Sequence, residues 1–272
     1  MPNSYHIQQI NHEIKMDHTK EFKKLLNFHI DAQRGMFISK IVRFKDKAGV
    51  AVFSHSESDP SWNIFYVNDL TAALAQEKEI VTQFAVRGRH PVWYQPNDAP
   101  PLPSNWTPFG SDCWMVRCGA PELPATTPPF TLRQVDHSNP SDVAAFNSLY
   151  IDVFWDGHPD PGAATPINSE PSAAGNFTAR HWLGDAPQGP VALISFLTRG
   201  DTAAIYNVGT PLATRGRGLG SAIMNYGMAA EAKLGIKKFF LITERDLPLE
   251  PFYRRLDFKT LTLGRYYRRD KA

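Results

Sequence analysis

The chain has 272 residues, a length typical of two domains of ordinary size. Its 42% hydrophobic and 12% aromatic residues are typical of a folded globular protein and argue against a disordered chain. A formal net charge of +2 is too small for a typical nucleic-acid-binding protein, so we expect no nucleic-acid partner. The densest basic segment, residues 265–271, is expected at a solvated strand edge or in a terminal tail.

No segment approaches the roughly 18–20 consecutive apolar residues of a membrane-spanning helix, and the N-terminus lacks the apolar stretch of a secretory signal. We therefore expect a cytoplasmic protein without a membrane partner. The two cysteines, Cys113 and Cys118, have neither Cys-x-x-Cys spacing nor an obvious set of further ligands. We expect two reduced thiols and no metal site.

The first part of the chain predicts a mixed α/β domain. Apolar residues recur at helical spacing in Phe22, Leu25, Leu26 and His29. A hairpin is predicted next, from residues 36–44 and 50–54 with a turn between them. The pattern then predicts a strand at 62–67, a helix from about 69 to 86, and a strand at 92–94.

A proline-rich segment separates the two parts of the chain. Its prolines are Pro121, Pro124, Pro128 and Pro129. Such a segment cannot form a regular helix or a central strand, because proline lacks the backbone N–H. We therefore predict an N-terminal domain at 1–120, a linker at 121–129 and a C-terminal domain at 130–272.

After the linker, Ser141 is expected to cap a helix. The apolar residues of this helix are Val143, Phe146, Leu149 and Val153. Residues 157–175 are rich in Pro, Gly, Ala, Asn and Ser, which predicts a long loop that is either functional or disordered. A substrate is a candidate to bind at this loop. A hairpin is predicted at 191–197 and 203–208, and a buried strand at 239–242.

Gly216, Gly218 and Gly220 form a turn between the second hairpin strand and a predicted helix. That helix carries Ile223, Tyr226, Ala230 and Leu234 on one face and is expected to end at Gly235. Unpaired N–H groups and the helix dipole make such a turn favourable for an anion. Glycine lets the anion approach the backbone and adopts positive φ. We predict a phosphate-binding turn, and a purely structural connection is the alternative.

The spacing of these glycines separates the turn from other nucleotide-binding motifs. It lacks the Gly-Lys-Ser/Thr ending of a P-loop and the Gly-x-Gly-x-x-Gly spacing of a dinucleotide fold. Arg215, Gly218 and Gly220 instead give Arg-x-x-Gly-x-Gly between a strand and a helix. In this the sequence resembles the GNAT superfamily of N-acetyltransferases, whose acetyl-CoA signature has this form.

The resemblance implies acetyl-CoA as the cosubstrate. It also implies that the strand end at Val208, Gly209 and Thr210 holds the acetyl and pantetheine end. The amides that would hold the pyrophosphate belong to Arg215, Gly216, Arg217, Gly218, Leu219, Gly220 and Ser221. The fold class implied is α/β (α+β), with two GNAT-like domains, each a mixed, mostly antiparallel sheet flanked by helices.

The first domain is expected to be a degenerate copy. The order of its elements over residues 19–94 echoes the C-terminal half, which suggests a tandem arrangement. The turn after its strand at 62–67 is only Asn68-Asp69, without glycine, so we do not expect it to hold a pyrophosphate in the same manner. An unrelated accessory α/β domain is the alternative.

A second similarity lies at residues 252–258, which resemble the Tyr-x-x-x-Gly-Phe segment of the family, with Asp257 in place of glycine. The resemblance implies that Tyr253 protonates the departing CoA thiolate. A tyrosine that only packs beside Phe252 is the alternative. The family often has Asn seven residues before this tyrosine, and the residue here is Asp246.

The general base stays open. Acetyl transfer requires a neutral amine, so a carboxylate, a histidine or a water must accept a proton. Glu244 is our candidate, with Asp246, Asp156 and His158 as further candidates near the expected cleft. Each of the four is alternatively a solvated surface residue.

The sequence thus predicts an N-acetyltransferase that moves an acetyl group from acetyl-CoA to an amine of a small molecule or peptide by direct attack. Two alternatives remain: a catalytically inactive CoA-binding regulatory or interaction protein, and a transferase that uses another acyl donor. The acceptor and the oligomeric state stay open, with a homodimer among the states considered.

Overall fold

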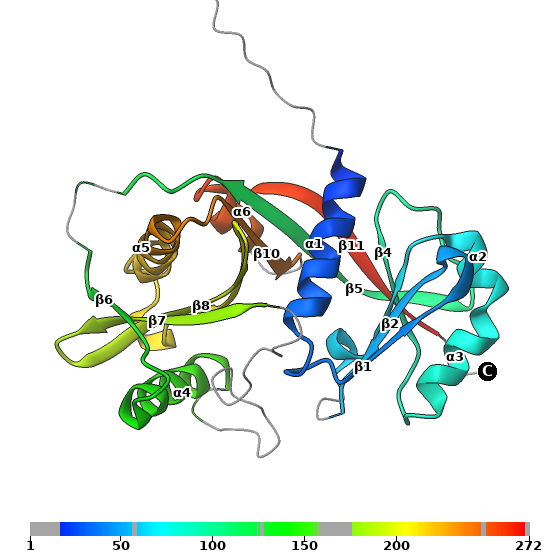
Figure 1. The fold of residues 1–272 in the computed structure, drawn as a ribbon, viewed down its shortest axis with the longest axis horizontal. Helices are drawn as coiled ribbons and strands as arrows, with labels where there is room; N and C mark the ends of the chain where they lie inside the picture. Colours follow the sequence, from blue (N-terminus) through cyan, green and yellow to red (C-terminus); the bar gives the residue numbers. More distant parts are fainter. Residues whose placement is uncertain are drawn as a thin grey trace, which may run out of the picture.

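The computed structural model describes residues 17–55, 59–123, 125, 128–155, 157, 176–245 and 249–269. The described residues form a mixed α/β fold in which 11 strands make one sheet, flanked by helices (Figure 1). The strand order is β1-β2-β3-β4-β11-β5-β10-β9-β8-β7-β6. Two neighbouring pairs, β3 with β4 and β9 with β10, run parallel, and the other pairs are antiparallel. The predicted fold class, a mostly antiparallel mixed sheet with helices, is confirmed.

The N-terminal half contains the predicted first helix and hairpin. Its elements are α1 (His18–Ala32), β1 (Lys40–Arg43), β2 (Gly49–Phe53), β3 (Ile64–Val67), α2 (Leu70–Ala75), α3 (Glu77–Ala85), β4 (Val92–Pro96) and β5 (Trp106–Cys118). The single helix predicted from 69 to 86 is wrong, because Gln76 leaves helical geometry between α2 and α3. The Gln76 side chain donates instead to the carbonyls of Lys45 and Ala72. Trp62 lies in a short 3-10 helix before β3.

The C-terminal half contains the predicted β8/β9 hairpin. Its elements are β6 (Thr131–Gln134), α4 (Pro140–Phe154), β7 (Thr178–Ala186), β8 (Gly189–Arg199), β9 (Thr202–Gly209), α5 (Leu219–Lys233), β10 (Lys238–Glu244), α6 (Leu249–Arg254) and β11 (Lys259–Arg269). The cap of α4 is Asn139 and not Ser141, since the Asn139 side chain accepts a hydrogen bond from the Ser141 amide. Pro140 then starts the helix, where its missing N–H needs no partner.

The face of α5 that packs on the sheet also differs from the prediction. Ile223 is buried as expected, but Tyr226 is only half-buried and Leu234 is exposed. The buried face carries Met224, Gly227, Met228 and Glu231 instead. Glu231 is tolerated there because its carboxylate accepts hydrogen bonds from Arg180 and from Trp182 on β7. The apolar residues alone therefore predicted a face rotated from the observed one.

The two halves exchange strands at the centre of the sheet. β11, from the end of the chain, lies between β4 and β5, and β5 pairs with β10 of the C-terminal half. The prediction that the basic segment at 265–271 is a strand edge or tail is therefore wrong for residues 265–269. Tyr267 is buried while Arg265 and Arg268 are exposed, so these arginines lie at solvent-exposed positions of a central strand. The domain division at 121–129 stays a prediction.

Helix α1 packs across the junction of the two halves (Figure 1). Phe22, Leu25 and Phe28 of α1 share one apolar cluster with Phe240 of β10 and Leu261 of β11. The cluster also includes residues of β8 and β9, such as Leu197 and Ala204. The apolar core is thus continuous between the halves at this helix.

Two absences concern the described residues alone. None of the helices in this part of the chain is long and apolar enough to span a membrane. Within the same part of the chain, no group of three or more His, Cys, Asp and Glu side chains could hold a metal ion. Cys113 and Cys118 both carry free thiols, as predicted.

Candidate functional site

The candidate site begins where the parallel strands β9 and β10 separate. They pair only over Thr202–Ala204 and Lys238–Phe240, although β9 continues to Gly209 and β10 to Glu244. Beyond that point β9 stays paired with β8 and β10 with β5. The edges that face the gap therefore carry backbone N–H and C=O groups without a strand partner, which a ligand can bind.

A bulge in β9 lies beside this gap. Leu193 of β8 pairs with Gly209, whereas Ser195 pairs with Tyr206, so β9 contains one extra residue. Asn207 takes up the extra length with a φ of 53°, a left-handed conformation that Asn tolerates better than most residues. The bulge changes the direction of the backbone before Val208 and Gly209, in the part of β9 that no longer pairs with β10.

A buried hydrogen-bond chain holds the bulge in place. The Asn207 side-chain amide donates to the Ser195 hydroxyl over 3.2 Å, and that hydroxyl is 2.7 Å from Nδ1 of His181 on β7. Burial, and secondarily the charge of His137, lowers the pKa of His181 to about 3. His181 is therefore neutral at physiological pH and links three strands beneath the bulge.

Gly209 is required by the close approach of α4. A Cβ at this position would lie 2.3 Å from Cγ1 of Val153, a distance that no real side chain tolerates. The end of α4 thus packs directly on the strand end predicted to hold the reacting group. Val208, Gly209 and Thr210 are all half-buried there.

The glycine-rich turn follows a short 3-10 helix, Leu212–Thr214. Gly216 and Gly218 have φ values of 77° and 76°, and Gly218 starts α5 without any side-chain cap. Among the described residues, none forms a hydrogen bond with the backbone amides of residues 216–221. These consecutive free N–H groups, at the positive end of a helix dipole, favour an anion.

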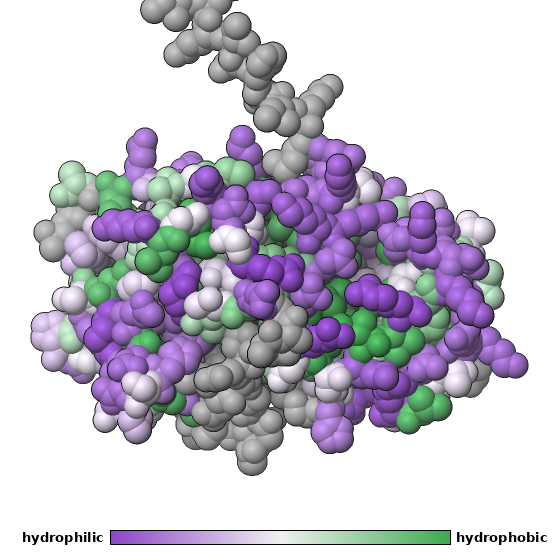
Figure 2. All heavy atoms as spheres, in the orientation of Figure 1, coloured by the Kyte–Doolittle hydropathy of each residue, from purple (hydrophilic) through white to green (hydrophobic). Residues whose placement is uncertain are grey.

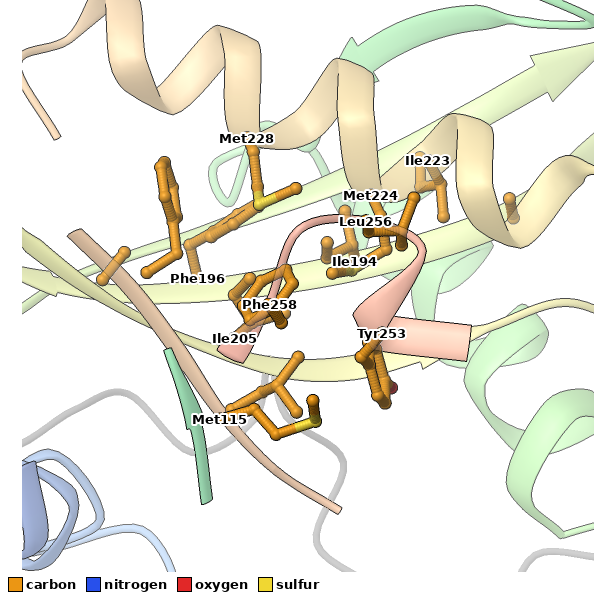
Figure 3. Packing of buried hydrophobic residues seen from close by; sticks show 14 of the residues in the cluster. Met115, Ile194, Phe196, Ile205, Ile223, Met224, Met228, Tyr253, Leu256 and Phe258 are labelled. Atoms are coloured by element: carbon orange, nitrogen blue, oxygen red, sulfur yellow. The ribbon is translucent and has the colours of Figure 1, made fainter. Parts of the chain in front are cut away.

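Tyr253 reaches the site from α6, which packs against the start of α5. The Phe252 ring lies 3.6 Å from where a Cβ on Gly220 would be, so α6 touches the glycine turn directly. Tyr253 is 9% exposed and contacts the rings of Phe252 and Phe258. Figure 3 shows it in the apolar cluster below α5 that also contains Met115 and Ile205. Burial raises the pKa of Tyr253 to about 12, so its hydroxyl stays protonated at neutral pH.

The model of the acetyltransferase (GNAT) family matches residues 145–258. This range includes the strand split, the bulge, the glycine turn and Tyr253. Residues 145–258 form a GNAT-family domain. No protein of curated function matches the sequence.

Solved structures extend the similarity of fold beyond the GNAT segment. A GCN5-related N-acetyltransferase from Kribbella flavida is 16% identical, with a TM-score of 0.63 over 95% of this chain and 97% of its own. One from Sphaerobacter thermophilus is 14% identical, with a TM-score of 0.57 over 83% and 82%. A tandem GNAT protein from the clavulanic acid biosynthesis pathway is 11% identical, with a TM-score of 0.54 over 83% and 80%. At these identities the likeness concerns the fold alone.

The GNAT segment departs from the family pattern at Asp257, and the structure explains why the turn persists. Asp257 has a φ of 60°, the conformation that glycine would adopt at this position. Its carboxylate accepts a hydrogen bond from Nη1 of Arg117 over 2.7 Å, and the same nitrogen donates to the Leu256 carbonyl over 2.6 Å. Arg117, on β5, thus stabilises a turn that glycine would form without help.

The four candidate bases are only partly placed. Glu244 is exposed at the end of β10, beyond the point where β10 leaves β9, and no described contact joins it to Tyr253. Asp246, Asp156 and His158 lie outside the described residues, as does the loop at 158–175. The structure therefore brings the predicted cofactor residues and Tyr253 together, while the assignment of the base stays a prediction.

Sequence reasoning missed the residues that support the bulge. Asn207, Ser195 and His181 were not singled out, although an Asn inside an otherwise β-forming run is a signal for a bulge or left-handed residue. The pairing of Ser195 with His181 had no local signal, because it connects β7 and β8 through side chains on one face of the sheet.

Proposed function

We propose that this protein is an N-acetyltransferase that transfers an acetyl group from acetyl-CoA to the amine of a small molecule or peptide. The observation that carries the proposal is the row of free backbone amides at 216–221, at the start of α5 within the GNAT segment. Such a row suits a pyrophosphate, because it offers several donors and no described side chain caps it.

The residues fit acetyl-CoA as cosubstrate. Amides of Gly216–Ser221 would hold its pyrophosphate, with the exposed side chains of Arg215 and Arg217 adding positive charge. The Arg215 amide, which was predicted to belong to this set, donates to the Leu212 carbonyl over 3.3 Å instead. The unpaired edge of β9 at Val208–Thr210 would bind the acetyl and pantetheine end. When bound, the cosubstrate supplies an activated acetyl thioester.

The chain's own groups would then orient the acetyl thioester and polarise its carbonyl group. An N–H at the β9 edge that donates to the thioester carbonyl would stabilise the negative charge that develops on its oxygen. The acceptor amine attacks the carbonyl carbon of the thioester directly, so no covalent enzyme intermediate is needed. The bulge at Asn207 sets the direction of this edge.

Tyr253 would act as the hydrogen-bond donor to the leaving sulfur. With its pKa raised to about 12, it is fully protonated, but complete proton transfer to a free thiolate, whose thiol pKa is roughly 8.5, is unfavourable. Its hydroxyl is therefore most effective while the carbon–sulfur bond is still breaking. Glu244, exposed at the end of β10, stays our candidate for the base that accepts the amine proton.

Three further points belong to the proposal. The N-terminal half would be a degenerate GNAT-like domain in tandem with the C-terminal catalytic domain, and it would complete the acceptor cleft through α1. The protein would work in the cytoplasm without nucleic-acid or membrane partners. A homodimer is one oligomeric state to be tested.

The test is an assay of CoA thiol release from acetyl-CoA over a panel of small-molecule and peptide amines. We expect amine-dependent release, with the acetylated amine detected by mass spectrometry. Tight CoA binding without release on any amine would favour a CoA-binding regulatory protein instead. Release only from longer acyl-CoA donors would favour a different acyltransferase.

A further inference from the structure

A second cleft lies in the N-terminal half, where the parallel strands β3 and β4 separate. They pair only through Phe65 with Trp93 and Tyr66 with Tyr94. Next to this split the structure has a cleft of about 740 Å³, between α1, the ends of β3 and β4, and the start of β11. Small-molecule sites usually measure roughly 300–1,000 Å³, so this cleft has the size of a binding site.

One side of the cleft is apolar. Its lining includes Phe22 of α1, Val50 of β2, Tyr66 of β3 and Leu261 of β11, which belong to one buried cluster. Leu26 of α1 extends this surface. In Figure 2 an apolar area beside α1, bordered by hydrophilic side chains, is visible on the face over this half. Four separate elements therefore supply a wall that suits a hydrocarbon chain or ring.

Cations from three elements converge on the same cleft. Lys23 lies on α1, Arg43 ends β1, and Lys47 lies in the turn before β2. All three are exposed, and no described residue forms an ion pair with any of them. Asp98 is the one carboxylate among the described residues that line the cleft. The net positive lining attracts an anion.

The anion is not held by helix amides here. The Asp69 carboxylate accepts a hydrogen bond from the Ala72 amide and caps α2, and the amides of Asn68 and Asp69 both reach the Ala48 carbonyl. A phosphate at this helix start would meet a negative charge and amides that are already paired. Binding must then rely on the lysine and arginine side chains, for which a carboxylate is a sufficient partner.

We propose that the β3/β4 cleft binds a small organic carboxylate with an apolar chain or ring. The carboxylate pairs with Lys23, Arg43 and Lys47, and the apolar part lies along Phe22 and Leu261. This ligand site is separate from the proposed acetyl-CoA site and does not depend on it.

Calorimetric titration with octanoate, and with neutral octanamide as its isosteric control, tests the proposal. We expect saturable octanoate binding and at least fivefold weaker octanamide binding, about the effect of one exposed ion pair. Lys23→Glu should weaken octanoate binding roughly tenfold, because a charge is reversed. Lys24→Glu is the matched control, since Lys24 is the next residue on α1, is exposed and does not line the cleft. It should leave the affinity unchanged.

Four results would overturn the proposal: no octanoate binding by folded protein, equal binding of octanamide, equal losses in both lysine variants, or displacement of octanoate by CoA. The last would place octanoate in the other cleft. Titrating the same variants with acetyl-CoA separates this inference from the proposed function. Lys23→Glu is expected to keep its full CoA affinity.

Discussion

Both halves of the sheet contain a pair of parallel strands that separate, but the helix that follows begins with different residues in each half. In each half a pair of parallel strands, β3/β4 or β9/β10, pairs briefly and then separates. After β9 a glycine-rich turn leaves the first amides of α5 without a hydrogen-bond partner among the described residues. After β3 the short Asn68-Asp69 turn leads directly into α2, and Asp69 caps that helix. The residues at the two helix starts therefore differ in charge and in available donors: a carboxylate caps α2, whereas no described side chain caps α5.

The residues where pairing ends differ as well. The last parallel pair is Ala204 with Phe240 in the C-terminal half, and Tyr66 with Tyr94 in the N-terminal half. Tyr94 donates to the buried carboxylate of Asp112 over 2.7 Å, and Tyr266 donates to it over 2.8 Å. A buried hydrogen-bond network of Tyr94, Tyr266 and Asp112 thus lies where β3 and β4 separate.

The largest effect is expected at Tyr253. Tyr253→Phe should lower turnover by roughly 10²–10⁴-fold with little change in acetyl-CoA affinity, because only the proton donor is lost. Steady-state kinetics together with calorimetry would measure both quantities. Tyr267→Phe, a buried tyrosine of β11 on the N-terminal side, is the matched control and should leave turnover unchanged. Equal turnover in the two variants would remove Tyr253 from the mechanism.

Asp112 is expected to make the stability of the folded protein depend on pH. Burial raises the pKa of Asp112 from 3.8 to about 6 despite its two tyrosine donors. As pH rises from 4 to 6, the unfolded state ionises first, so the native state loses stability. The loss attributable to this group is about 3 kcal/mol over its whole titration, since one pKa unit corresponds to about 1.4 kcal/mol, and about 2 kcal/mol of it falls between pH of roughly 4 and 6.

Urea unfolding of wild type and Asp112→Asn across this pH range measures that loss. Because Asn does not titrate, the stability of wild type relative to the variant should fall as pH rises from 4 to 6. Stability curves that stay parallel would show that Asp112 titrates at its ordinary pKa.

The difference between the helix starts can be tested by copying an acid from one half to the other. Asn and Asp both tolerate left-handed φ, so Gly218→Asn and Gly218→Asp should fold alike. Gly218→Asp should bind acetyl-CoA at least roughly tenfold more weakly than Gly218→Asn, because its carboxylate repels the pyrophosphate. Equal affinities would contradict a pyrophosphate at this turn.

The smallest effect concerns the cap of α2. Asp69→Ala should lower the free energy of unfolding by about 1 kcal/mol, since the Ala72 amide loses its acceptor. Thermal or urea unfolding would detect it. Asp98→Ala, an exposed carboxylate that caps no helix, should change stability by less than about 0.5 kcal/mol. No acetyl-CoA binding should appear in the N-terminal half of Asp69→Ala, because removing the acid creates no glycine turn.

Local features of the site were predictable from the sequence. The glycine turn, the β8/β9 hairpin and the helix after the turn depend on residues close together in the chain, and their signals are strong. The cap of α4 was predicted two residues late because Asn139 and Ser141 are both good capping residues.

Features that depend on distant partners were not predictable. β5 contains Pro108, Gly110 and Asp112, which break the alternating pattern of a strand, and it is stabilised by pairing with β10 and β11. β11 resembles an edge strand because of its arginines, and only pairing with β4 and β5 makes it central. Likewise, the support that Arg117 gives to Asp257 links positions 140 residues apart.

The most direct test of the central claim is calorimetric titration with acetyl-CoA of wild type, Gly220→Val and Ala230→Val. Valine at position 220 would fill the space between the free amides and Phe252, whereas Ala230 lies on the same helix away from the turn. The account predicts saturable binding to wild type and Ala230→Val, and no measurable binding to folded Gly220→Val. Unchanged binding by Gly220→Val would contradict the placement of the cosubstrate, and no binding by folded wild type would contradict the acetyltransferase proposal itself.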